Sequence, residues 1–130
     1  MSVAKLRRIS PVVPVRDVAA TAAFYARHLG FETAFMMPDA SYAVVARDGQ
    51  AVHLTGAEGD EATLQATANN ISFVIDVAEV DRLWAEVEAS RPPTKARPPE
   101  DKPWGLREFH ILDPDGCLLR FAQDLGQGDS

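Results

Sequence analysis

One pattern occurs twice in this sequence, and the repeat constrains the fold more than any other feature. Residues 9–17 read Ile-Ser-Pro-Val-Val-Pro-Val-Arg-Asp, and residues 71–79 read Ile-Ser-Phe-Val-Ile-Asp-Val-Ala-Glu, an offset of 71 minus 9, or 62. The pair Asp48-Gly49 recurs as Asp115-Gly116 at an offset of 116 minus 49, or 67. We expect the five additional residues in the proline-rich stretch 91–103, because surface loops tolerate changes in length. Two copies of one unit predict a pseudo-symmetric body with a shared concavity.

Each copy is predicted to be a β-α-β-β-β unit. In the first copy, residues 9–15 form an edge or irregular strand, because prolines occupy positions 11 and 14. Asp17 is a natural N-cap for a helix that ends at Gly30. Further strands are expected over 31–37, 42–46 and 50–55, the last two joined across Asp48-Gly49.

The second copy follows a polar, acidic stretch over 56–68 that is typical of a linker. We expect a strand over 70–77, a helix over 78–90, a short strand near 95–97, and a hairpin of 107–112 with 117–123. Residues 124–130 are expected to fray. The chain is thus predicted to be a single domain over 1–130, with module one at about 6–57, a linker at about 56–68 and module two at about 69–124.

Composition excludes several classes of protein. Cys117 is the only cysteine, which rules out an internal disulfide or a cysteine-built zinc site and fits a reducing compartment. The net charge of -6 argues against binding to a phosphate backbone, which requires clustered Lys and Arg. No segment approaches the roughly 20 apolar residues of a membrane span or contains the apolar core of a signal peptide. We therefore expect a cytoplasmic protein with no nucleic-acid or membrane partner.

Several local motifs resemble one known superfamily. The first half contains Arg16-Asp17, the run Thr21-Ala22-Ala23-Phe24-Tyr25, and Leu29-Gly30-Phe31. The second half has Trp104-Gly105, which leads through Asp113-Pro114-Asp115-Gly116 to Leu118-Leu119-Arg120 and Gln123. These motifs resemble the vicinal oxygen chelate superfamily, which holds glyoxalase I, extradiol dioxygenases and bleomycin-resistance proteins, and especially its bleomycin-resistance branch.

The resemblance implies a fold and an assembly. The fold class is α+β, with two tandem βαβββ modules that form a cupped mixed sheet of the glyoxalase/bleomycin-resistance type. In the bleomycin-resistance branch, two chains form a homodimer with two ligand grooves at the subunit boundary. A homodimer with a small-molecule ligand is therefore expected here as well.

The four positions that hold metal in the metal-dependent members can be located by the internal repeat. Ser10 and Ser72 each precede Asp17 and Glu79 by seven residues, while His53 and Arg120 each follow the hairpin glycine by four. Hydroxyl groups are weak ligands, and a guanidinium group would repel the ion. A first-row divalent ion needs three or four imidazole, carboxylate or thiolate ligands. The sequence therefore predicts no metal site and no cofactor.

The same repeat indicates which side chains could line a pocket. If the two hairpins share a register, Tyr42 opposes His53 just as Phe109 opposes Arg120, although ordinary sheet packing explains both aromatic residues equally well. Glu108 and His110 lie on the opposite face of their strand from Phe109, and the sequence leaves open which face lines the pocket. Trp104 lies outside any regular element, as a stacking wall or a dimer contact. The candidate ligand-binding residues are Tyr42, His53, Trp104, Phe109, Arg120, Ser10, Ser72, Glu108 and His110.

Three functions remain open at this stage. The first is metal-independent binding, or sequestration, of a small cationic or aromatic molecule, as in bleomycin-resistance proteins. The second is a lyase, isomerase or dioxygenase of the same superfamily with an atypical site, in which His53, or His110 with Glu108, acts as a base. The third is an interaction module that binds no small molecule.

Overall fold

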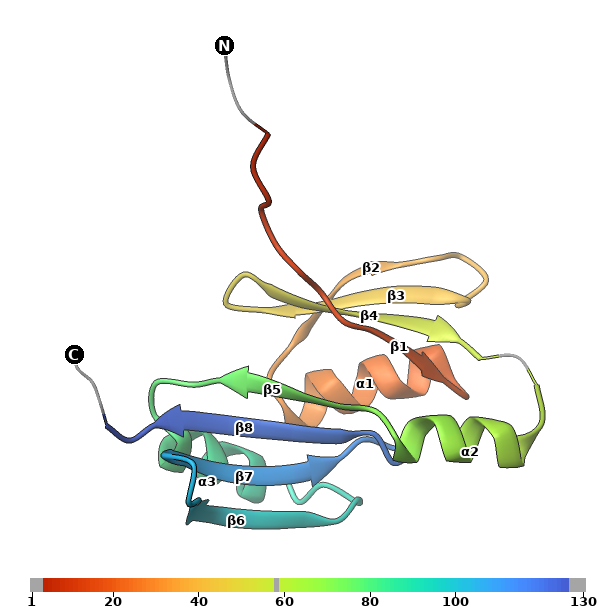
Figure 1. Ribbon diagram of the computed structural model, residues 1–130. Coiled ribbons are helices and arrows are strands. Elements are labelled where there is room, and N and C mark those ends of the chain that lie inside the picture. Colours follow the sequence, from red (N-terminus) through yellow and green to blue (C-terminus); the bar gives the residue numbers. More distant parts are fainter. Residues whose placement is uncertain (1–3, 58, 127–130) are drawn as a thin grey trace.

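The computed structural model describes residues 4–57 and 59–126, and it contains two similar modules joined by a helix (Figure 1). The first module comprises β1 Val12–Val15, α1 Val18–His28, β2 Glu32–Met36, β3 Tyr42–Arg47 and β4 Gln50–Gly56. The helix α2 spans Glu61–Asn69. The second module comprises β5 Ser72–Asp76, α3 Val80–Ala89, β6 Ala96–Asp101, β7 Leu106–Leu112 and β8 Leu118–Asp124.

The strands form two four-stranded mixed sheets with equivalent topology. Their orders are β1-β4-β3-β2 and β5-β8-β7-β6, with β1 parallel to β4, β5 parallel to β8, and all other neighbours antiparallel. Helix α1 packs on the first sheet and α3 on the second (Figure 1). The predicted α+β fold with tandem βαβββ modules is confirmed.

The register of the parallel pairs reproduces the repeat found in the sequence. Val12 pairs with His53 in the first sheet, and Val74 pairs with Arg120 in the second. The offsets are 74 minus 12, or 62, and 120 minus 53, or 67, which are the two offsets of the sequence pattern. His53 and Arg120 therefore occupy equivalent positions in the two modules.

The two hairpins differ by one residue in the turn. Asp48 and Gly49 alone connect Arg47 to its partner Gln50, and both have positive φ (52° and 81°), as a two-residue hairpin turn requires. In the second hairpin, the backbone N–H of Asp113 donates to the carbonyl of Cys117 at 2.9 Å, so three residues lie between them. One of the five additional residues is therefore in this turn and not in the stretch 91–103.

This difference overturns the expected shared register. Tyr42 pairs with Thr55 and not with His53, which is a shift of two positions that leaves Tyr42 on the same face of the sheet. Phe109 pairs with Phe121 and not with Arg120, which is a shift of one position and places Phe109 on the opposite face. The residue that pairs with Arg120 is His110.

The core fills the space between each sheet and its helix. Helix α1 begins where predicted, because the Asp17 carboxylate accepts a hydrogen bond from the N–H of Ala20 at 2.9 Å. The predicted edge position of the proline-containing strand β1 is confirmed. Burial of apolar side chains supplies the main stabilisation of both modules. Core residues include Val13, Val15, Tyr25, Leu29, Val45, Leu54, Val80, Val87, Phe109, Ile111, Leu119 and Phe121.

Two segments differ from the sequence prediction. The stretch expected to be a linker contains α2, because Asp60 caps its N-terminus and Leu64 and Ala68 are buried. Strand β6 extends to Asp101 through Pro98 and Pro99, where the pairing with β7 shifts register. An edge strand tolerates proline because its outer N–H groups have no sheet partner. In the predicted fraying tail, β8 continues to Asp124, and residues 127–130 lie outside the described residues.

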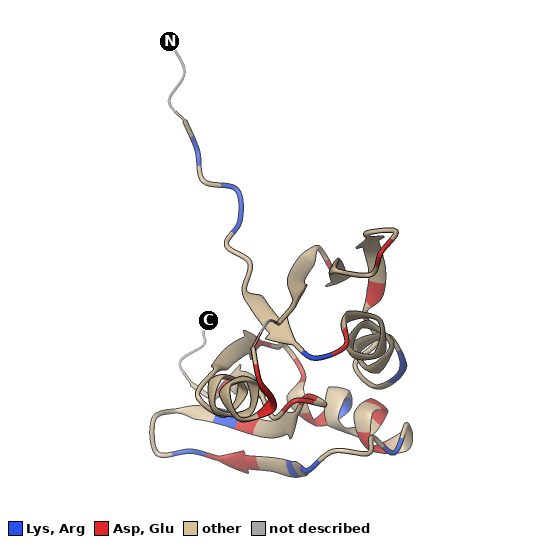
Figure 2. Cartoon of the chain, turned by 90° about the vertical axis from the view of Figure 1, so that its right-hand side faces the viewer, with Lys and Arg blue, Asp and Glu red and all other residues tan. Residues whose placement is uncertain are grey.

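Polar contacts join the two modules. The backbone N–H of Arg16 donates to Asp115 at 3.2 Å, so the turn of the second hairpin is attached to the end of β1. Arg47 donates to the carbonyl of Leu29 at 2.8 Å and to Glu86 of α3 at 3.3 Å. By contrast, the segment before β1 leads away from both sheets with its basic positions exposed (Figure 2).

The turn between β7 and β8 gives a test of the fold. One oxygen of the buried Asp113 accepts hydrogen bonds from the N–H groups of Asp115 (2.8 Å) and Cys117 (2.9 Å). Asp113→Ala leaves both donors without this acceptor, so we expect the free energy of unfolding in urea to fall by about 2 kcal/mol or more. Asp113→Asn keeps the acceptor oxygen and removes the carboxyl group, whose pKa is raised by burial. It should lose at most about half as much stability; equal losses in the two variants would contradict this assignment.

Candidate ligand-binding faces

Each sheet has an open face on the side away from its helix. On the first sheet, strand pairing aligns four side chains in a row across all four strands, and we call this row face one: Phe35, Val44, His53 and Val12. The equivalent row on the second sheet is face two: Arg97, His110, Arg120 and Val74. Val12, Phe35 and Val74 are each about half exposed, at 54%, 48% and 49%. These are large apolar side chains in contact with water.

Face one is organised by one hydrogen bond between two aromatic side chains. The Tyr42 hydroxyl lies 2.6 Å from Nδ1 of His53, and the two rings meet edge to face with centroids 5.6 Å apart. The contact is diagonal across β3 and β4, between neighbours two positions apart on the same face. It leaves Nε2 as the second polar atom of the imidazole ring, and His53 pairs with the apolar Val12 and Val44 on its two neighbouring strands.

Face two is organised by a buried carboxylate. Glu108 is 1% exposed and accepts four hydrogen bonds, two on each oxygen. Oε1 accepts from Nε2 of His110 (2.8 Å) and Nε of Arg120 (3.1 Å). Oε2 accepts from Nη2 of Arg120 (3.0 Å) and Nε1 of Trp104 (2.8 Å). Arg120 thus meets the carboxylate through two parallel bonds, the geometry that a planar guanidinium favours.

Trp104 reaches this cluster from the tip of a tight turn. Residues 102–105 connect β6 to β7, the N–H of Gly105 donates to the carbonyl of Lys102 at 3.1 Å, and Gly105 has φ +87°, which favours glycine. The indole then folds back over β7 and lies beside Arg120, whose guanidinium carbon is 5.9 Å from the ring centroid. Although its N–H is bound, Trp104 remains 58% exposed and can contact a ligand.

The hydrogen bonds at Glu108 determine its ionisation. Burial by itself raises the pKa of Glu108, but hydrogen bonds from Arg120, His110 and Trp104 outweigh burial and hold the pKa at about 2. The same contact raises the pKa of Arg120. Carboxylate and guanidinium are therefore both charged at neutral pH and cancel each other.

The two organising pairs occupy equivalent positions. Tyr42 pairs with Thr55 in the first sheet and Glu108 pairs with Ala122 in the second, at offsets of 108 minus 42, or 66, and 122 minus 55, or 67. Tyr42 with His53 therefore corresponds to Glu108 with Arg120. One scaffold position carries a neutral aromatic pair in one module and an ion pair in the other.

The structure brings most of the predicted site residues to the open faces. Tyr42 and His53 meet on the first sheet, and Glu108, His110, Arg120 and Trp104 meet on the second. Ser72 begins β5, two positions from Val74 of face two, and the half-buried Ser10 precedes β1.

Phe109 does not lie on an open face, and the prediction that it lines a pocket is wrong. It is fully buried, stacked on Phe121 with ring centroids 4.8 Å apart and packed against Trp84 at 5.2 Å. The one-residue shift in the second hairpin turns its side chain toward α3.

The sequence prediction missed Phe35, Val12, Val44, Val74 and Arg97. Each is aligned by strand pairing with a residue that was predicted, so the missing signal was the register across neighbouring strands. The tandem repeat identified corresponding positions along the chain. It did not identify which residues of β2 and β6 lie beside them, because both strands contain an irregularity in pairing.

The metal-binding potential of the described residues is limited. Within 4–57 and 59–126, no three His, Cys, Asp or Glu side chains gather in a group that could hold an ion. Cys117 is buried, and burial raises the pKa of its thiol to about 12. A thiol with this pKa stays protonated at neutral pH and is a poor ligand or nucleophile.

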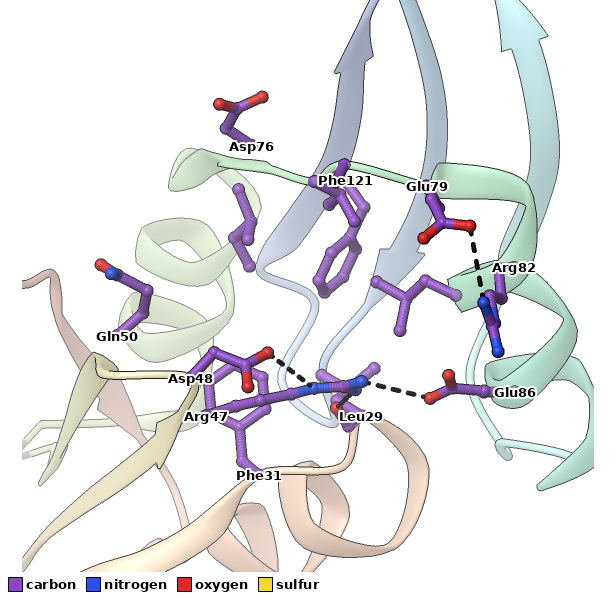
Figure 3. A pocket seen from close by; sticks show the side chains of 14 residues that line it. Leu29, Phe31, Arg47, Asp48, Gln50, Asp76, Glu79, Arg82, Glu86 and Phe121 are labelled. Atoms are coloured by element: carbon purple, nitrogen blue, oxygen red, sulfur yellow. Dashed lines mark hydrogen bonds and ion pairs between the residues drawn. The ribbon is translucent and has the colours of Figure 1, made fainter.

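A separate cavity of about 460 Å³ lies at the junction of the modules (Figure 3). Phe31 and Phe121 contribute apolar walls, and Arg47 extends between Asp48 and Glu86 at its rim. None of the candidate ligand-binding residues lines this cavity. We therefore assign the candidate site to the open faces, where the exposed aromatic and charged groups converge.

The fold and the open faces define a paired-module βαβββ protein, and comparison with known proteins gives its family. Residues 7–121 match the Glyoxalase/Bleomycin resistance protein/Dioxygenase superfamily, and the chain belongs to it. A bleomycin resistance protein of Klebsiella pneumoniae is 33% identical over 121 residues, which cover 88% of this chain and 90% of that protein.

Solved structures of similar proteins agree with this family. The bleomycin-binding protein of the bleomycin producer Streptomyces verticillus, in complex with copper(II)-bleomycin, is 29% identical with a TM-score of 0.77, covering 96% of this chain and all of that chain. A bleomycin-binding protein in complex with bleomycin is 25% identical with a TM-score of 0.76, covering 92% of this chain and 99% of that chain.

The ionisation of Glu108 can be tested through stability. Since its pKa is about 2 in the folded chain against an ordinary value of 4.5, its stabilisation is complete above about pH 4.5 and is lost as the pH falls toward 2. We expect the free energy of unfolding to fall less steeply over this range in Glu108→Gln than in the natural chain, as measured by urea titrations. Glu88→Gln, at an exposed position of α3, is the control and should keep the natural slope. Identical slopes in all three proteins would argue against this assignment.

Proposed function

We propose that the chain binds and sequesters a small cationic or aromatic molecule, with bleomycin as the first candidate, and that it does so without a metal ion of its own. The observation that carries the proposal is the cluster on face two, where an exposed indole lies beside a guanidinium whose charge is cancelled. Such a surface offers a flat aromatic platform with little electrostatic penalty for a cationic ligand. The bleomycin-binding relatives support the same ligand class.

We further propose that the protein acts as a homodimer in the cytoplasm. Support for a dimer comes from the exposed apolar side chains of the segment before β1, where Leu6 is 95% and Ile9 is 90% exposed, and from the apolar residues of both open faces. A second copy of the chain would remove this area from water. Among the described residues, no helix is long and apolar enough to cross a membrane. The lone cysteine supports a reducing compartment, and the net charge of -6 supports a partner other than nucleic acid.

The alternative function, a lyase or dioxygenase of the same superfamily, is less well supported by the site. Both oxygens of Glu108 are occupied by donors, and a pKa of about 2 makes the carboxylate a weak base. The second ring nitrogen of His53, Nε2, has no hydrogen-bond partner among the residues that the structure describes, so His53 is the better candidate for proton transfer. Turnover of the methylglyoxal-glutathione adduct with added nickel or zinc, lost in His53→Ala, would favour this alternative.

Binding can be measured directly by calorimetry with metal-free bleomycin in a buffer that contains EDTA. We expect saturable binding by the natural chain and a loss of about tenfold or more in affinity for Trp104→Ala, because truncating an exposed aromatic contact removes its stacking area. Trp84→Phe is the matched control, since Trp84 packs against Phe109 on the helix side of the same sheet. It should retain the natural affinity. No heat of binding with or without EDTA would contradict the proposed ligand, and binding only in its absence would contradict metal independence.

The oligomeric state is testable by sedimentation equilibrium. We expect a mass twice that of one chain, and a shift toward monomer in the double variant Leu6→Ser with Ile9→Ser, which removes exposed apolar area. Lys5→Ser, in the same exposed segment, is the control and should remain dimeric. A monomer at all concentrations of the natural chain would contradict the homodimer.

A further inference from the structure

We propose that Glu108 is the positioning residue of face two: it fixes the orientation of Trp104 and neutralises Arg120, so that the face accepts a planar ligand with a neutral or positive charge. The role in ligand choice rests on the proposed function. The role in orienting Trp104 concerns the unliganded chain and can be tested separately.

The geometry of the Trp104 turn explains why such a residue is needed. The turn over residues 102–105 fixes the backbone of Trp104 through the Lys102–Gly105 hydrogen bond and the positive φ of Gly105. It does not fix the side chain, which projects from the tip of the turn and is 58% exposed. The only hydrogen bond that an indole can donate is through Nε1, and here it goes to Glu108 at 2.8 Å. This bond holds the ring against the sheet and leaves its surface available to a ligand.

The same carboxylate also orients Arg120. Two hydrogen bonds to the two oxygens of Glu108, at 3.1 and 3.0 Å, fix the plane of the guanidinium. The guanidinium then lies 5.9 Å from the centre of the indole. Trp104 and Arg120 therefore donate to one common acceptor, and their position relative to each other depends on Glu108.

Glu108 is also the source of negative charge within this cluster. Face two contains the guanidinium groups of Arg97 and Arg120, and the ion pair with Glu108 cancels the second of them. Arg97 has the carboxylate of Glu100 nearby on β6, so loss of Glu108 would leave Arg120 as the uncompensated cation, and like charges repel a cationic ligand at close range. The carboxylate itself is 1% exposed and does not offer an oxygen to a ligand, so it acts through Trp104 and Arg120.

The module repeat supports this reading. Tyr42 is the equivalent of Glu108 in the first module and makes one hydrogen bond, to His53. Glu108 replaces that single bond with four, and one of its donors, His110, stands where the first module has the apolar Val44. Both modules have one polar pair at this position, so the additional contacts are a feature of face two itself.

The test uses the full chain and the indole N–H signals of the two tryptophans in a ¹⁵N–¹H NMR spectrum, assigned with Trp104→Phe. In Glu108→Ala we expect the Trp104 indole proton to move upfield, because it loses its carboxylate acceptor, while the Trp84 signal stays in place. The matched control is Glu88→Ala, which removes an exposed carboxylate from α3, on the helix side of the same sheet. The control should leave the Trp104 indole signal unchanged.

Glu108→Gln separates charge from shape and provides a folded variant if the alanine variant does not fold. It keeps the volume of the side chain but converts one oxygen into a donor, so Arg120 can no longer form both of its bonds. Affinity for metal-free bleomycin should fall by about tenfold or more, and adding salt should partly restore it because salt screens the uncompensated charge of Arg120. Glu88→Gln, on the helix side of the sheet, should show neither effect.

The outcomes distinguish this inference from the proposed function. If the natural chain does not bind bleomycin but the Trp104 indole signal moves in the Glu108 variants, the ligand is wrong and the positioning role stands. If the indole signal is unchanged in both Glu108 variants, the positioning role is overturned whatever the ligand. If the indole signal moves but the affinity of both variants equals that of the natural chain, Glu108 orients Trp104 without affecting ligand binding, and the specificity role is overturned.

Discussion

The alternation of side chains along each strand, with one face of each sheet covered by a helix, is the constraint on which this structure depends. Successive residues of a strand point to opposite faces. Once Val52 and Leu54 are buried under α1, His53 must point the other way, and the burial of Leu119 and Phe121 places Arg120 likewise. The core therefore determines which side chains form the open faces, and the polar residues there are fixed by the apolar residues on either side of them.

The two modules use this common frame for different chemistry. The first presents a tyrosine–histidine pair among apolar neighbours, and the second presents an ion pair with an indole and an imidazole attached to it. A ligand that contacts both kinds of face would meet apolar and aromatic area on one and a planar, charge-compensated surface on the other. The duplication thus preserves the backbone while the side chains at equivalent positions have diverged.

Much of the fold could be predicted because its signals are local and repeated. A few residues are enough to identify the Asp17 cap, the Asp48-Gly49 turn and the two Ile-Ser motifs. The register of the second hairpin could not be predicted, because Asp113-Pro114-Asp115-Gly116 allows more than one turn length. A difference of one residue exchanges the side chains on the two faces of β7. For that reason the sequence pattern pointed to Phe109 as a pocket residue and left open whether the face that carries Glu108 lines the pocket. Helix α2 was missed because only Leu64 and Ala68 of its nine residues are buried.

The extra residue in the second turn has an evolutionary consequence. In a duplicated gene, inserting a single codon there exchanges the inner and outer side chains of an entire strand, without any substitution within it. Such an exchange is stable only where both sets of residues tolerate their new surroundings, and in β7 the outward-facing carboxylate and imidazole have hydrogen-bond partners. Turn length can therefore supply new surface chemistry to an old scaffold in one step.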